Sequence, residues 1–424
     1  MQTHLAPEYQ HTADGQAAEA LLRKCVHCGF CTATCPTYQL LGDELDGPRG
    51  RIYLIKQVLE GAQPTTKTQL HLDRCLTCRN CETTCPSGVE YGHLLDIGRK
   101  LVDAKVPRPW PQRSLRWALK EGLPSPLFGP AMKLGQLVRP LLPAALKSKV
   151  PAKQQAGAWP TRPLARKVLM LAGCVQPAMA PNINSATARV LDAMGVQTVL
   201  ASGAGCCGAV KFHLDDQDGG MAQMRANIDA WWAHIEPAGG ATVAPVEAII
   251  MNASGCGVTV KEYGHILQDD PLYASKAARV SELTVDVSEW LPEMVAKLKA
   301  RVAARNGALG GKIAFHPPCS LQHGQQLRGG VERHLSELGF EVKLTGCDAH
   351  LCCGSAGTYS VLNPKLSYQL RDRKLEALDQ TFGTQTPDQI VSANIGCITH
   401  LQSGTATPVR HWIEVLDEAL CPTS

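Results

Sequence analysis

Residues 25–36 read CVHCGFCTATCP, and residues 75–86 read CLTCRNCETTCP. Each stretch places four cysteines in the spacing C-x2-C-x2-C-x3-C directly before a proline, and the second copy lies 50 residues after the first. This spacing is too regular to be explained by packing. We interpret the two stretches as a pair of loops that each hold a metal centre.

The spacing is typical of bacterial ferredoxins that hold [4Fe-4S] clusters, in which the fourth cysteine ligates the other cluster. On that rule one cluster takes Cys25, Cys28, Cys31 and Cys85, and the other takes Cys75, Cys78, Cys81 and Cys35. Zinc sites fit less well, since they use pairs of cysteines with a longer gap between the pairs. The segments 51–61 and 94–104 have the apolar periodicity of helices, which predicts a mainly helical module.

Length and composition indicate several domains in a reducing compartment. The chain has 424 residues, a formal net charge of +4 and 18 cysteines. We find no signal peptide and no apolar run of the roughly 18 to 20 residues that span a bilayer, so we expect a cytoplasmic protein. Cytosolic thiols stay reduced, which favours metal ligation over a disulfide framework.

A second, looser repeat occupies the rest of the chain. Single, paired and single cysteines recur in the same order, and their offsets of about 140 to 150 residues indicate an internal duplication. The two sets are Cys174, Cys206, Cys207 and Cys256, and Cys319, Cys352, Cys353 and Cys397.

Around these cysteines the chain reads as strand, helix and strand. Segments 167–173 and 312–316 read as buried strands, each followed by an amphipathic helix and another strand, the unit of a parallel sheet. Cysteines just beyond strand ends then converge at one sheet edge. We expect an α+β multidomain chain, in which a helical di-cluster module precedes two tandem α/β repeats. The predicted domains are residues 17–100 (two clusters), 101–165 (basic, proline-rich connector), 166–300 (first repeat) and 311–415 (second repeat).

The loop Gly203–Gly208, GAGCCG, formally matches the glycine pattern of a dinucleotide site. Two thiolates in it would repel a pyrophosphate, and the expected acidic residue is not where a second strand would place it. We therefore expect neither nucleotide nor flavin on this chain.

These motifs support a resemblance to a known family. The front resembles the twin [4Fe-4S] module, and the rear the duplicated cysteine-rich CCG domain, of heterodisulfide reductase, anaerobic glycerol-3-phosphate dehydrogenase and lactate-utilisation proteins. More narrowly, the chain resembles the iron-sulfur subunits of bacterial glycolate oxidase, also called glycolate dehydrogenase. The narrower resemblance rests on the two cysteine runs and on NIDAWW (227–232), SGCG (254–257), HLCCGSAGTY (350–359), ANIGC (393–397) and VRHWIE (409–414).

The resemblance implies an electron-transfer role. In that family a flavoprotein subunit oxidises glycolate to glyoxylate, and the iron-sulfur subunit passes electrons to the respiratory chain, to quinone, at the cytoplasmic face of the inner membrane. Catalytic residues are then expected on a partner. Two alternatives stay open: an equivalent subunit for lactate or glycerol 3-phosphate, and a thiol-disulfide reductase acting at the rear cysteines.

The rear departs from the full CCG motif, which ends in C-x2-C. Ala253 and Asn394 stand where the first cysteine of that pair is expected, so each repeat keeps four thiols. Each set is a candidate site for a further iron-sulfur cluster or metal, and buried, packed thiols are the alternative. Cys347 and Cys421 fall outside both sets, and we expect Cys347 to be a packed thiol. The histidines that flank the rear cysteines are expected to be hydrogen-bonded loop residues rather than ligands: His213, His316, His323, His350 and His400.

The connector is a candidate docking segment. Residues 105–153 contain ten Lys or Arg and one acid, Glu121, interleaved with Trp and Leu. Such a stretch suits an anionic membrane surface or a partner subunit. Its prolines exclude one continuous helix. Nucleic acid is not expected, because no binding motif accompanies the charge.

Overall fold

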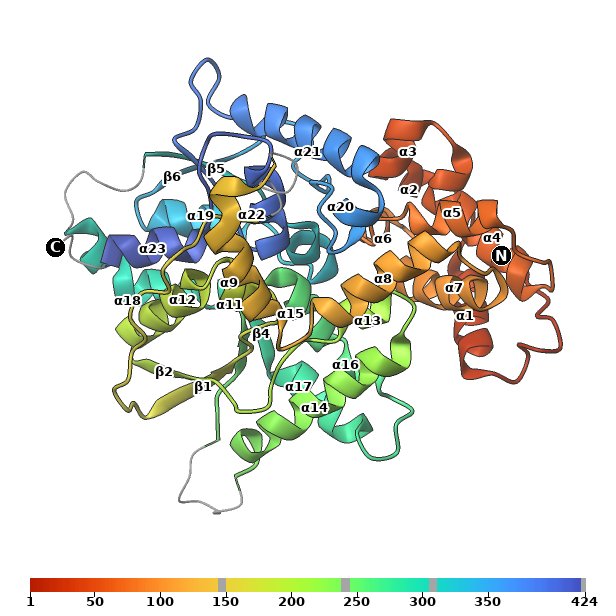
Figure 1. Ribbon diagram of the computed structural model, residues 1–424, viewed down its shortest axis with the longest axis horizontal. Helices are drawn as coiled ribbons and strands as arrows, with labels where there is room; N and C mark the ends of the chain where they lie inside the picture. The colour runs from red at the N-terminus through yellow and green to blue at the C-terminus, as the bar shows by residue number, and fades with distance from the viewer. Residues whose placement is uncertain (144–149, 238–244, 305–310, 421–424) are drawn as a thin grey trace.

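The computed structural model describes residues 1–143, 150–237, 245–304 and 311–420. A helical front module, a helical connector and two parallel sheets follow one another along the chain (Figure 1). This confirms the predicted fold class. The residue boundaries of the four predicted domains stay a prediction.

The front module consists of short helices around the two cysteine runs. Its core is formed by the apolar faces of α1, α4 and α7, with Leu22, Ile55 and Leu94 fully buried. The helices predicted at 51–61 and 94–104 are present as α4 and α7. The elements are α1 (Ala13–Lys24), α2 (Phe30–Ala33), α3 (Pro36–Leu41), η1 (Glu44–Asp46), α4 (Pro48–Leu59), α5 (Thr66–Asp73), α6 (Asn80–Thr84) and α7 (Tyr91–Lys105).

The first repeat is a four-stranded parallel sheet with strand order β2-β1-β3-β4. Its strands are β1 (Arg166–Met170), β2 (Val196–Val199), β3 (Ile249–Met251) and β4 (Thr284–Asp286). Its helices are α11 (Gln176–Met179), α12 (Asn182–Ala193), α13 (Ala209–His213), α14 (Gln217–Ile235), α15 (Ser254–Lys261), α16 (Tyr263–Ile266), α17 (Ala274–Leu283), η4 (Val287–Trp290) and α18 (Leu291–Ala303).

The second repeat has the same topology, with strand order β6-β5-β7-β8, all parallel. Its strands are β5 (Lys312–Phe315), β6 (Glu341–Leu344), β7 (Gln389–Ser392) and β8 (Val409–His411). Its helices are η5 (Ser320–Gly324, a π-helix), α19 (Gly330–Glu337), α20 (Tyr359–Leu362), α21 (Pro364–Asp379), α22 (Ile395–Gln402) and α23 (Trp412–Leu420). In both sheets the chain reverses its direction of travel beside the first strand, which creates a crevice at the carboxyl ends of β1 and β3, and of β5 and β7.

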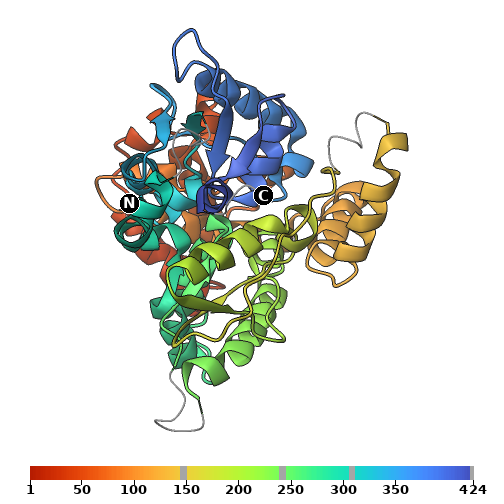
Figure 2. The ribbon, with the colours of Figure 1, turned by 90° about the vertical axis from the view of Figure 1, so that its left-hand side faces the viewer.

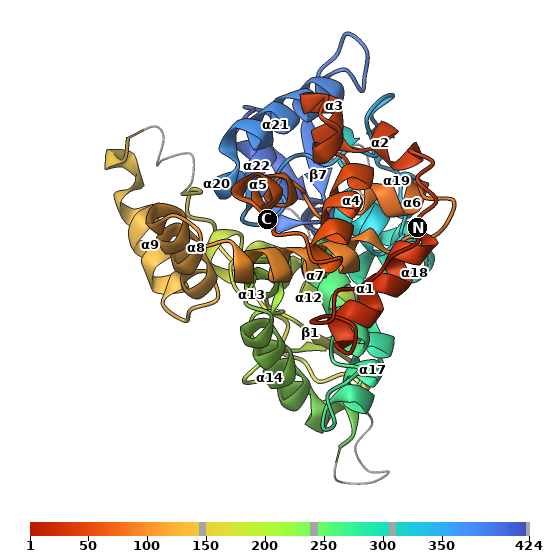
Figure 3. The ribbon, with the colours of Figure 1, turned by 90° about the vertical axis from the view of Figure 1, so that its right-hand side faces the viewer.

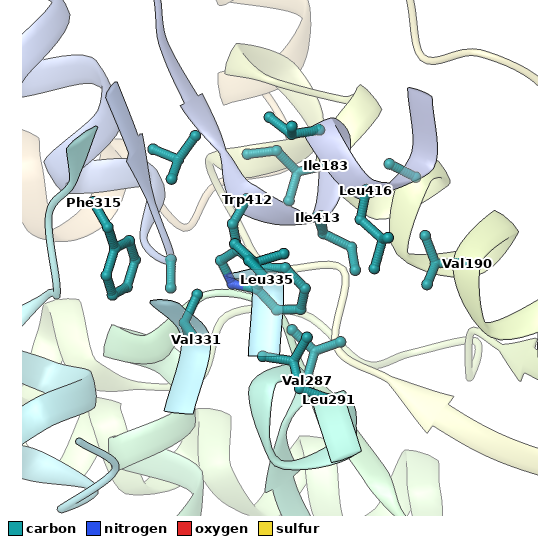
Figure 4. Close-up of a cluster of buried hydrophobic side chains, with 14 of the residues drawn as sticks. Ile183, Val190, Val287, Leu291, Phe315, Val331, Leu335, Trp412, Ile413 and Leu416 are labelled. Carbon is teal, nitrogen blue, oxygen red and sulfur yellow. The ribbon is translucent and has the colours of Figure 1, made fainter. Parts of the chain in front are cut away.

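The two repeats share one hydrophobic core. Helix α23 at the end of the second repeat packs on α12 of the first, and α18 at the end of the first packs on α19 of the second. Trp412 lies in the middle of this core, with Leu335 and Ile413 beside it (Figure 4). The exchange of terminal helices fixes the two sheets relative to each other, and with them the two sets of rear cysteines.

The connector forms a helical pair, α8 (Trp110–Gly122) and α9 (Phe128–Val138), followed by η2 (Arg139–Leu141). The pair projects from one side of the molecule (Figures 2 and 3). Part of its basic charge is paired within the chain, because Arg108 and Arg116 form ion pairs with Asp73 and Asp215. The connector is therefore less basic on its surface than its composition suggests. It exposes apolar side chains instead, namely Trp110, Trp117, Leu127, Leu134, Leu137 and Leu141. In the described part of the chain, no helix is both long enough and apolar enough to traverse a lipid bilayer.

Candidate metal centres

The loop that carries the first cysteine run surrounds a small pocket, and two of its residues have positive φ. His27 and Gly29 have φ of 56° and 84°, so the loop between Cys25 and helix α2 turns back on itself. Cys25, Cys28, Cys31 and Cys85 line the resulting pocket, together with Cys81 of the second run. Burial, the neighbouring thiol of Cys25 and, to a smaller extent, those of Cys85 and Cys28 raise the pKa of Cys31 to about 11. Four thiols around one pocket, with none of the described cysteines in a disulfide, form a donor set suited to a metal cluster.

The second run repeats this geometry. Thr77 and Arg79 occupy the positions of His27 and Gly29 and also have positive φ, 52° and 57°. Burial and the neighbouring Cys319, Cys75 and Cys35 thiols raise the pKa of Cys78. Burial, then Cys78, Cys75 and Cys35, raise the pKa of Cys81 as well. Cys75, Cys78, Cys81 and Cys35 therefore lie close to one another.

The two cysteine runs contact each other directly. Helices α2 and α6 pack against each other, and the hydroxyls of Thr34 and Thr84, at equivalent positions, lie 3.1 Å apart. The side-chain amide of Asn80 donates to the Thr34 carbonyl at 2.9 Å. Cys35 and Cys85, the fourth cysteines of the two runs, directly follow this pair of threonines.

A fully buried arginine accompanies the second front site. Arg51 on α4 donates to the carbonyl of His71 at 2.7 Å and to the hydroxyl of Thr37 at 3.2 Å, and its side chain lies 3.6 Å from Asp46. Burial lowers the pKa of Arg51, but the charges of Cys75, Tyr91, Cys35 and Asp46 outweigh it and raise the pKa above its usual value. Arg51 thus supplies a fixed positive charge beside Cys35 and Cys75.

The first rear set lies at the carboxyl end of its sheet. Cys174 follows β1, Cys206 and Cys207 follow β2, and Cys256 lies in α15 after β3. Hydrogen bonds from the thiols of Cys174 and Cys207, and from the backbone N–H groups of Gly208 and Val210, lower the pKa of Cys206 to about 3. Hydrogen bonds to the backbone hold the cysteine pair in place: Asn227 donates to the Cys206 carbonyl at 2.8 Å and Tyr263 donates to the Cys207 carbonyl at 2.9 Å.

The second rear set is arranged in the same way. The Sγ atoms of Cys319 and Cys352 lie 3.7 Å apart, and Cys353 interacts with both Cys352 and Cys397. Burial lowers the pKa of Lys374, while the Cys353 and Cys352 thiolates act in the opposite direction, so its ammonium group faces these thiols. Lys374 is held there by donating to the carbonyl of Asp348.

The glycine of each CCG sequence is required by the backbone. Gly208 and Gly354 have φ of 93° and 88°, in the left-handed region that favours glycine. A Cβ atom at Gly354 would lie 2.4 Å from the Ser367 carbonyl oxygen, and one at Gly208 would lie 2.8 Å from that of Gly220. Each glycine lets the cysteine pair turn against the following helix, α14 or α21.

Three of the four cysteine sets meet at one cavity. It has a volume of about 1020 Å³ and lies between the front module, the connector and both repeats. Its cysteines come from the second front site, the first rear set and the second rear set: Cys75, Cys78, Cys174, Cys206, Cys207, Cys256, Cys319, Cys352 and Cys397. Apolar residues of the connector close one side, among them Leu115, Leu119 and Phe128.

Four further residues were singled out in the sequence near the rear cysteines or outside the cysteine sets. Ala253 and Asn394 line the cavity, and the Asn394 amide donates to the Cys397 sulfur at 3.8 Å. Cys347 is exposed, so the expectation of a packed thiol is wrong: its loop lies outside the core. Cys421 lies outside the described residues.

The flanking histidines are mostly hydrogen-bonded, as expected. His213 contacts Asp96, His323 contacts Thr83, and His400 contacts Ser367. His316 differs, because neither ring nitrogen has a hydrogen-bond partner in the described part of the chain.

Sequence reasoning missed Arg51 and Lys374 as parts of these sites. Both are cations on helix faces that are otherwise buried, in α4 and α21. A charged residue at an apolar register position was the available signal, since such a group must find a buried anion.

Comparison with known proteins gives three matches along the chain. Residues 21–89 match the family model described as 4Fe-4S dicluster domain, and residues 168–261 and 313–402 each match the model described as Cysteine-rich domain. The chain is 55% identical over 423 residues to the glycolate oxidase iron-sulfur subunit of Escherichia coli (strain K12), covering 99% of both proteins.

Two further relatives are more distant. The probable glycolate oxidase iron-sulfur subunit of Bacillus subtilis (strain 168) is 30% identical over 421 residues, covering 91% of this chain and 89% of the relative. Lactate utilization protein A of Geobacillus thermodenitrificans (strain NG80-2) is 26% identical over 264 residues, covering 59% of this chain and 98% of that protein.

Proposed function

This chain belongs to the family of glycolate oxidase iron-sulfur subunits, and from that premise we propose that it carries electrons from a flavoprotein subunit that oxidises glycolate to glyoxylate towards a quinone. The family resemblance inferred from the sequence is thereby confirmed. The chain is an iron-sulfur electron-transfer subunit of an oxidoreductase complex. Oxidation of the substrate itself is assigned to the partner flavoprotein.

The front module is proposed to hold two [4Fe-4S] clusters with crossed ligation. Cys25, Cys28, Cys31 and Cys85 would bind one, and Cys75, Cys78, Cys81 and Cys35 the other. The neighbouring thiols that raise the pKa values of Cys31, Cys78 and Cys81 support the two groups. When bound, such clusters exchange single electrons, which suits them to follow a flavin that accepts two electrons together.

The observation that carries the proposal is the contact of Cys78 with the second rear set. Cys78 packs in one cluster with Cys352 and Tyr359, and Cys319 lies against it. Tyr359 donates to the carbonyl of Arg74 at 3.1 Å, and Asn80 donates to that of His350 at 3.2 Å, which fixes the front module on this repeat. A second front site in direct contact with the rear thiols is what a relay requires.

We propose that the rear thiols also bind metal and that the acceptor reaches them through the cavity. Each repeat offers four converging thiols at the crevice of a parallel sheet. The apolar side formed by Leu115, Leu119 and Phe128 suits a quinone ring and tail better than a charged acceptor.

The projecting connector is proposed to contact a membrane surface peripherally. Trp110, Trp117 and Leu134 are exposed on it, and its helix α8 also carries Arg113. Replacing Trp110 and Trp117 by Ser should reduce co-sedimentation with anionic vesicles. Unchanged sedimentation, with loss of the complex on gel filtration, would assign this face to a partner subunit.

Two other functions use the same sites. The chain covers 98% of a lactate utilization protein at 26% identity, so an equivalent role with lactate or glycerol 3-phosphate is the nearest alternative. A thiol-disulfide reductase would use the rear thiols directly, and they should then react with an alkylating reagent only in the presence of substrate.

The deciding experiment uses the purified complex. Glycolate, lactate and glycerol 3-phosphate are offered in turn, and bleaching of the iron-sulfur absorbance and reduction of a soluble quinone are followed under anaerobic conditions. We expect glycolate to give the fastest reduction of both. Reduction of the flavin with no bleaching of the iron-sulfur absorbance would overturn the proposal. Iron and acid-labile sulfide counted on the same material should reach about eight of each for two cubanes, and more if the rear sites hold clusters.

A further inference from the structure

His316 occupies a rigid position at the second rear set. It is the first residue after strand β5, and its backbone continues the sheet: its N–H donates to the Val391 carbonyl at 2.8 Å. Its own carbonyl accepts from the hydroxyl of Ser392 at 2.9 Å. The direction of its side chain is therefore fixed by β5 and β7.

The imidazole ring is buried without a hydrogen bond. His316 is 1% exposed, and both Nδ1 and Nε2 lack a partner in the described part of the chain. Buried imidazole nitrogens normally donate or accept, because leaving them unpaired costs free energy. The other rear histidines with assigned contacts, His213, His323 and His400, follow that rule. An unpaired ring nitrogen directed at thiols calls for a different partner.

Two thiols lie at the right separation for a shared metal. One ligand atom from each of His316, Cys353 and Cys397 lies within 4.8 Å of the others, and all three residues are buried. Two sulfurs bound at about 2.3 Å to one tetrahedral ion would be about 3.8 Å apart, so a small contraction around an ion suffices. Imidazole and thiolate together suit zinc or iron.

The described part of the first repeat has no matching group of one histidine and two cysteines. Leu171 lies three residues before Cys174, just as His316 lies three residues before Cys319. Both repeats have lost one cysteine of the C-x2-C pair, at Ala253 and Asn394. Among the residues that the structure describes, only the second repeat brings a histidine nitrogen to its remaining cysteine, Cys397.

We propose that His316 is a metal ligand and that, with Cys353 and Cys397, it forms an imidazole-dithiolate site for a borderline-soft transition-metal ion. The ion is either Zn²⁺ or an iron of an iron-sulfur centre. This inference deepens the proposed rear site and rests on the proposal that the rear thiols bind metal. The inference makes the two repeats chemically unequal. Both have lost the first cysteine of the C-x2-C pair, and the imidazole of His316 supplies a substitute donor in the second repeat.

The test compares His316→Leu and His316→Cys in the full chain, purified anaerobically with its partners. Leucine is the residue at the matching place in the first repeat, so His316→Leu removes the ligand at a size that this fold accepts. His316→Cys keeps a donor atom. His411→Gln is the control, because His411 is another fully buried histidine with an unpaired Nε2.

Metal counts and spectra distinguish a zinc ion from an iron of an iron-sulfur centre. If the ion is Zn²⁺, His316→Leu loses about one zinc per chain, and cobalt substitution of the parent gives a thiolate-to-cobalt band that this variant lacks. If the metal is a cluster iron, the parent labelled with ¹⁵N-histidine shows an imidazole nitrogen coupling in pulsed paramagnetic resonance, and His316→Leu loses it. In both cases His316→Cys retains the metal and His411→Gln behaves as the parent.

The inference is overturned if the parent shows neither zinc nor a histidine nitrogen coupling, a result that needs no folded variant. Equal metal content and spectra in His316→Leu and the parent overturn it as well. Failure of the proposed electron-transfer function would give a different result. Glycolate would then leave the iron-sulfur absorbance of the complex unbleached, whether or not His316 binds a metal.

Discussion

The sulfurs of Cys319 and Cys352 lie 3.7 Å apart, in contact but well beyond the roughly 2 Å of a disulfide. Cys78 of the front module lies against the same pair. A thiol from a ferredoxin-like loop therefore meets two thiols of a parallel-sheet repeat, although more than 240 residues separate them in sequence. This junction brings the second front site into contact with the thiols of the second repeat.

Replacing Cys35 by Ser should damage the site built on residues 75–81 and spare the site built on residues 25–31. Cys35 is close to Cys78 and Cys81, whereas Cys85 is close to Cys31. Paramagnetic resonance of the reduced protein should lose the signal of one cluster, and Cys85→Ser should remove the other signal. Cys347→Ser, at an exposed lone cysteine, should change neither. If Cys35→Ser removes the signal that Cys85→Ser also removes, the crossed assignment is wrong.

Replacing Arg51 by Met should lower the midpoint potential of the second front cluster. The buried guanidinium beside Cys35 and Cys75 favours the reduced, more negative state, so its loss disfavours reduction. We expect a shift of roughly 60 mV, a tenfold change for a one-electron couple. Redox titration followed by paramagnetic resonance measures it. Lys56→Met on the same helix, which removes a cation paired with Glu60, should leave the potential unchanged.

The features that the sequence predicted are those that depend on neighbouring residues in the chain. The 50-residue repeat of the cysteine runs corresponds to equal backbone turns, with positive φ at His27 and Thr77 and again at Gly29 and Arg79. The rear strands and the cysteines beyond them followed from short apolar runs ending in loops. Spacing and periodicity suffice for such features because they depend on neighbouring residues.

What the sequence could not predict depends on how the parts pack. The exchange of α18 and α23 between the repeats is a tertiary contact with no local signature. Likewise, Arg108 and Arg116 counted as part of a basic docking surface until their ion pairs with Asp73 and Asp215 were seen. His316 was expected to be an ordinary loop histidine, because its lack of a partner is visible only in three dimensions.

Replacing Gly354 by Ala should destabilise the second repeat by about 3 kcal/mol. Its φ of 88° disfavours any side chain, and the new Cβ would also lie 2.4 Å from the Ser367 carbonyl oxygen. Gly383→Ala separates the two effects, since Gly383 has φ of 70° and no atom within 4 Å of the added Cβ. The control should cost about 1 kcal/mol. Chemical denaturation measures both, and equal losses would show that the close approach to Ser367 relaxes freely.

Replacing Glu262 by Gln should loosen the front module from the first repeat. Glu262 accepts two hydrogen bonds from Arg79, one of them at 2.8 Å, and contacts His93 at 3.1 Å. Arg79 lies in the second cysteine loop, so this ion pair ties the loop to helix α16. Because both side chains are largely buried, removing one charge should cost roughly 3 kcal/mol. Glu289→Gln, which breaks the more exposed pair with Lys261, should cost less than about 1 kcal/mol.

The pH dependence of the same contact gives an independent check on Glu262. Burial would raise the pKa of Glu262, but hydrogen bonds from His93 and Arg79 and the Arg79 charge lower it from 4.5 to about 2. A carboxylate with a lowered pKa stabilises the fold above its unfolded pKa, and that contribution is lost as the pH falls from about 4.5 towards 2. Burial lowers the pKa of His93, but the hydrogen bond and charge of Glu262 outweigh burial and raise this pKa above 6.5. The stabilisation that His93 provides is therefore complete below pH 6.5, and it is lost as the pH rises through the pKa of His93 in the folded protein.

Denaturant midpoints measured from pH 5.5 to 8.5 avoid acid loss of the clusters. Burial lowers the pKa of other histidines, among them His265 and His323, and these groups make stability rise with pH, so the effect of His93 is read as a difference between variants. As the pH rises through the folded pKa of His93, the parent should lose stability relative to Glu262→Gln, because His93 has no carboxylate beside it in that variant. The parent should lose stability relative to His93→Asn in the same way, although this variant keeps the Arg79 pair. Differences from the parent that stay constant across this pH range would contradict the assignment to His93.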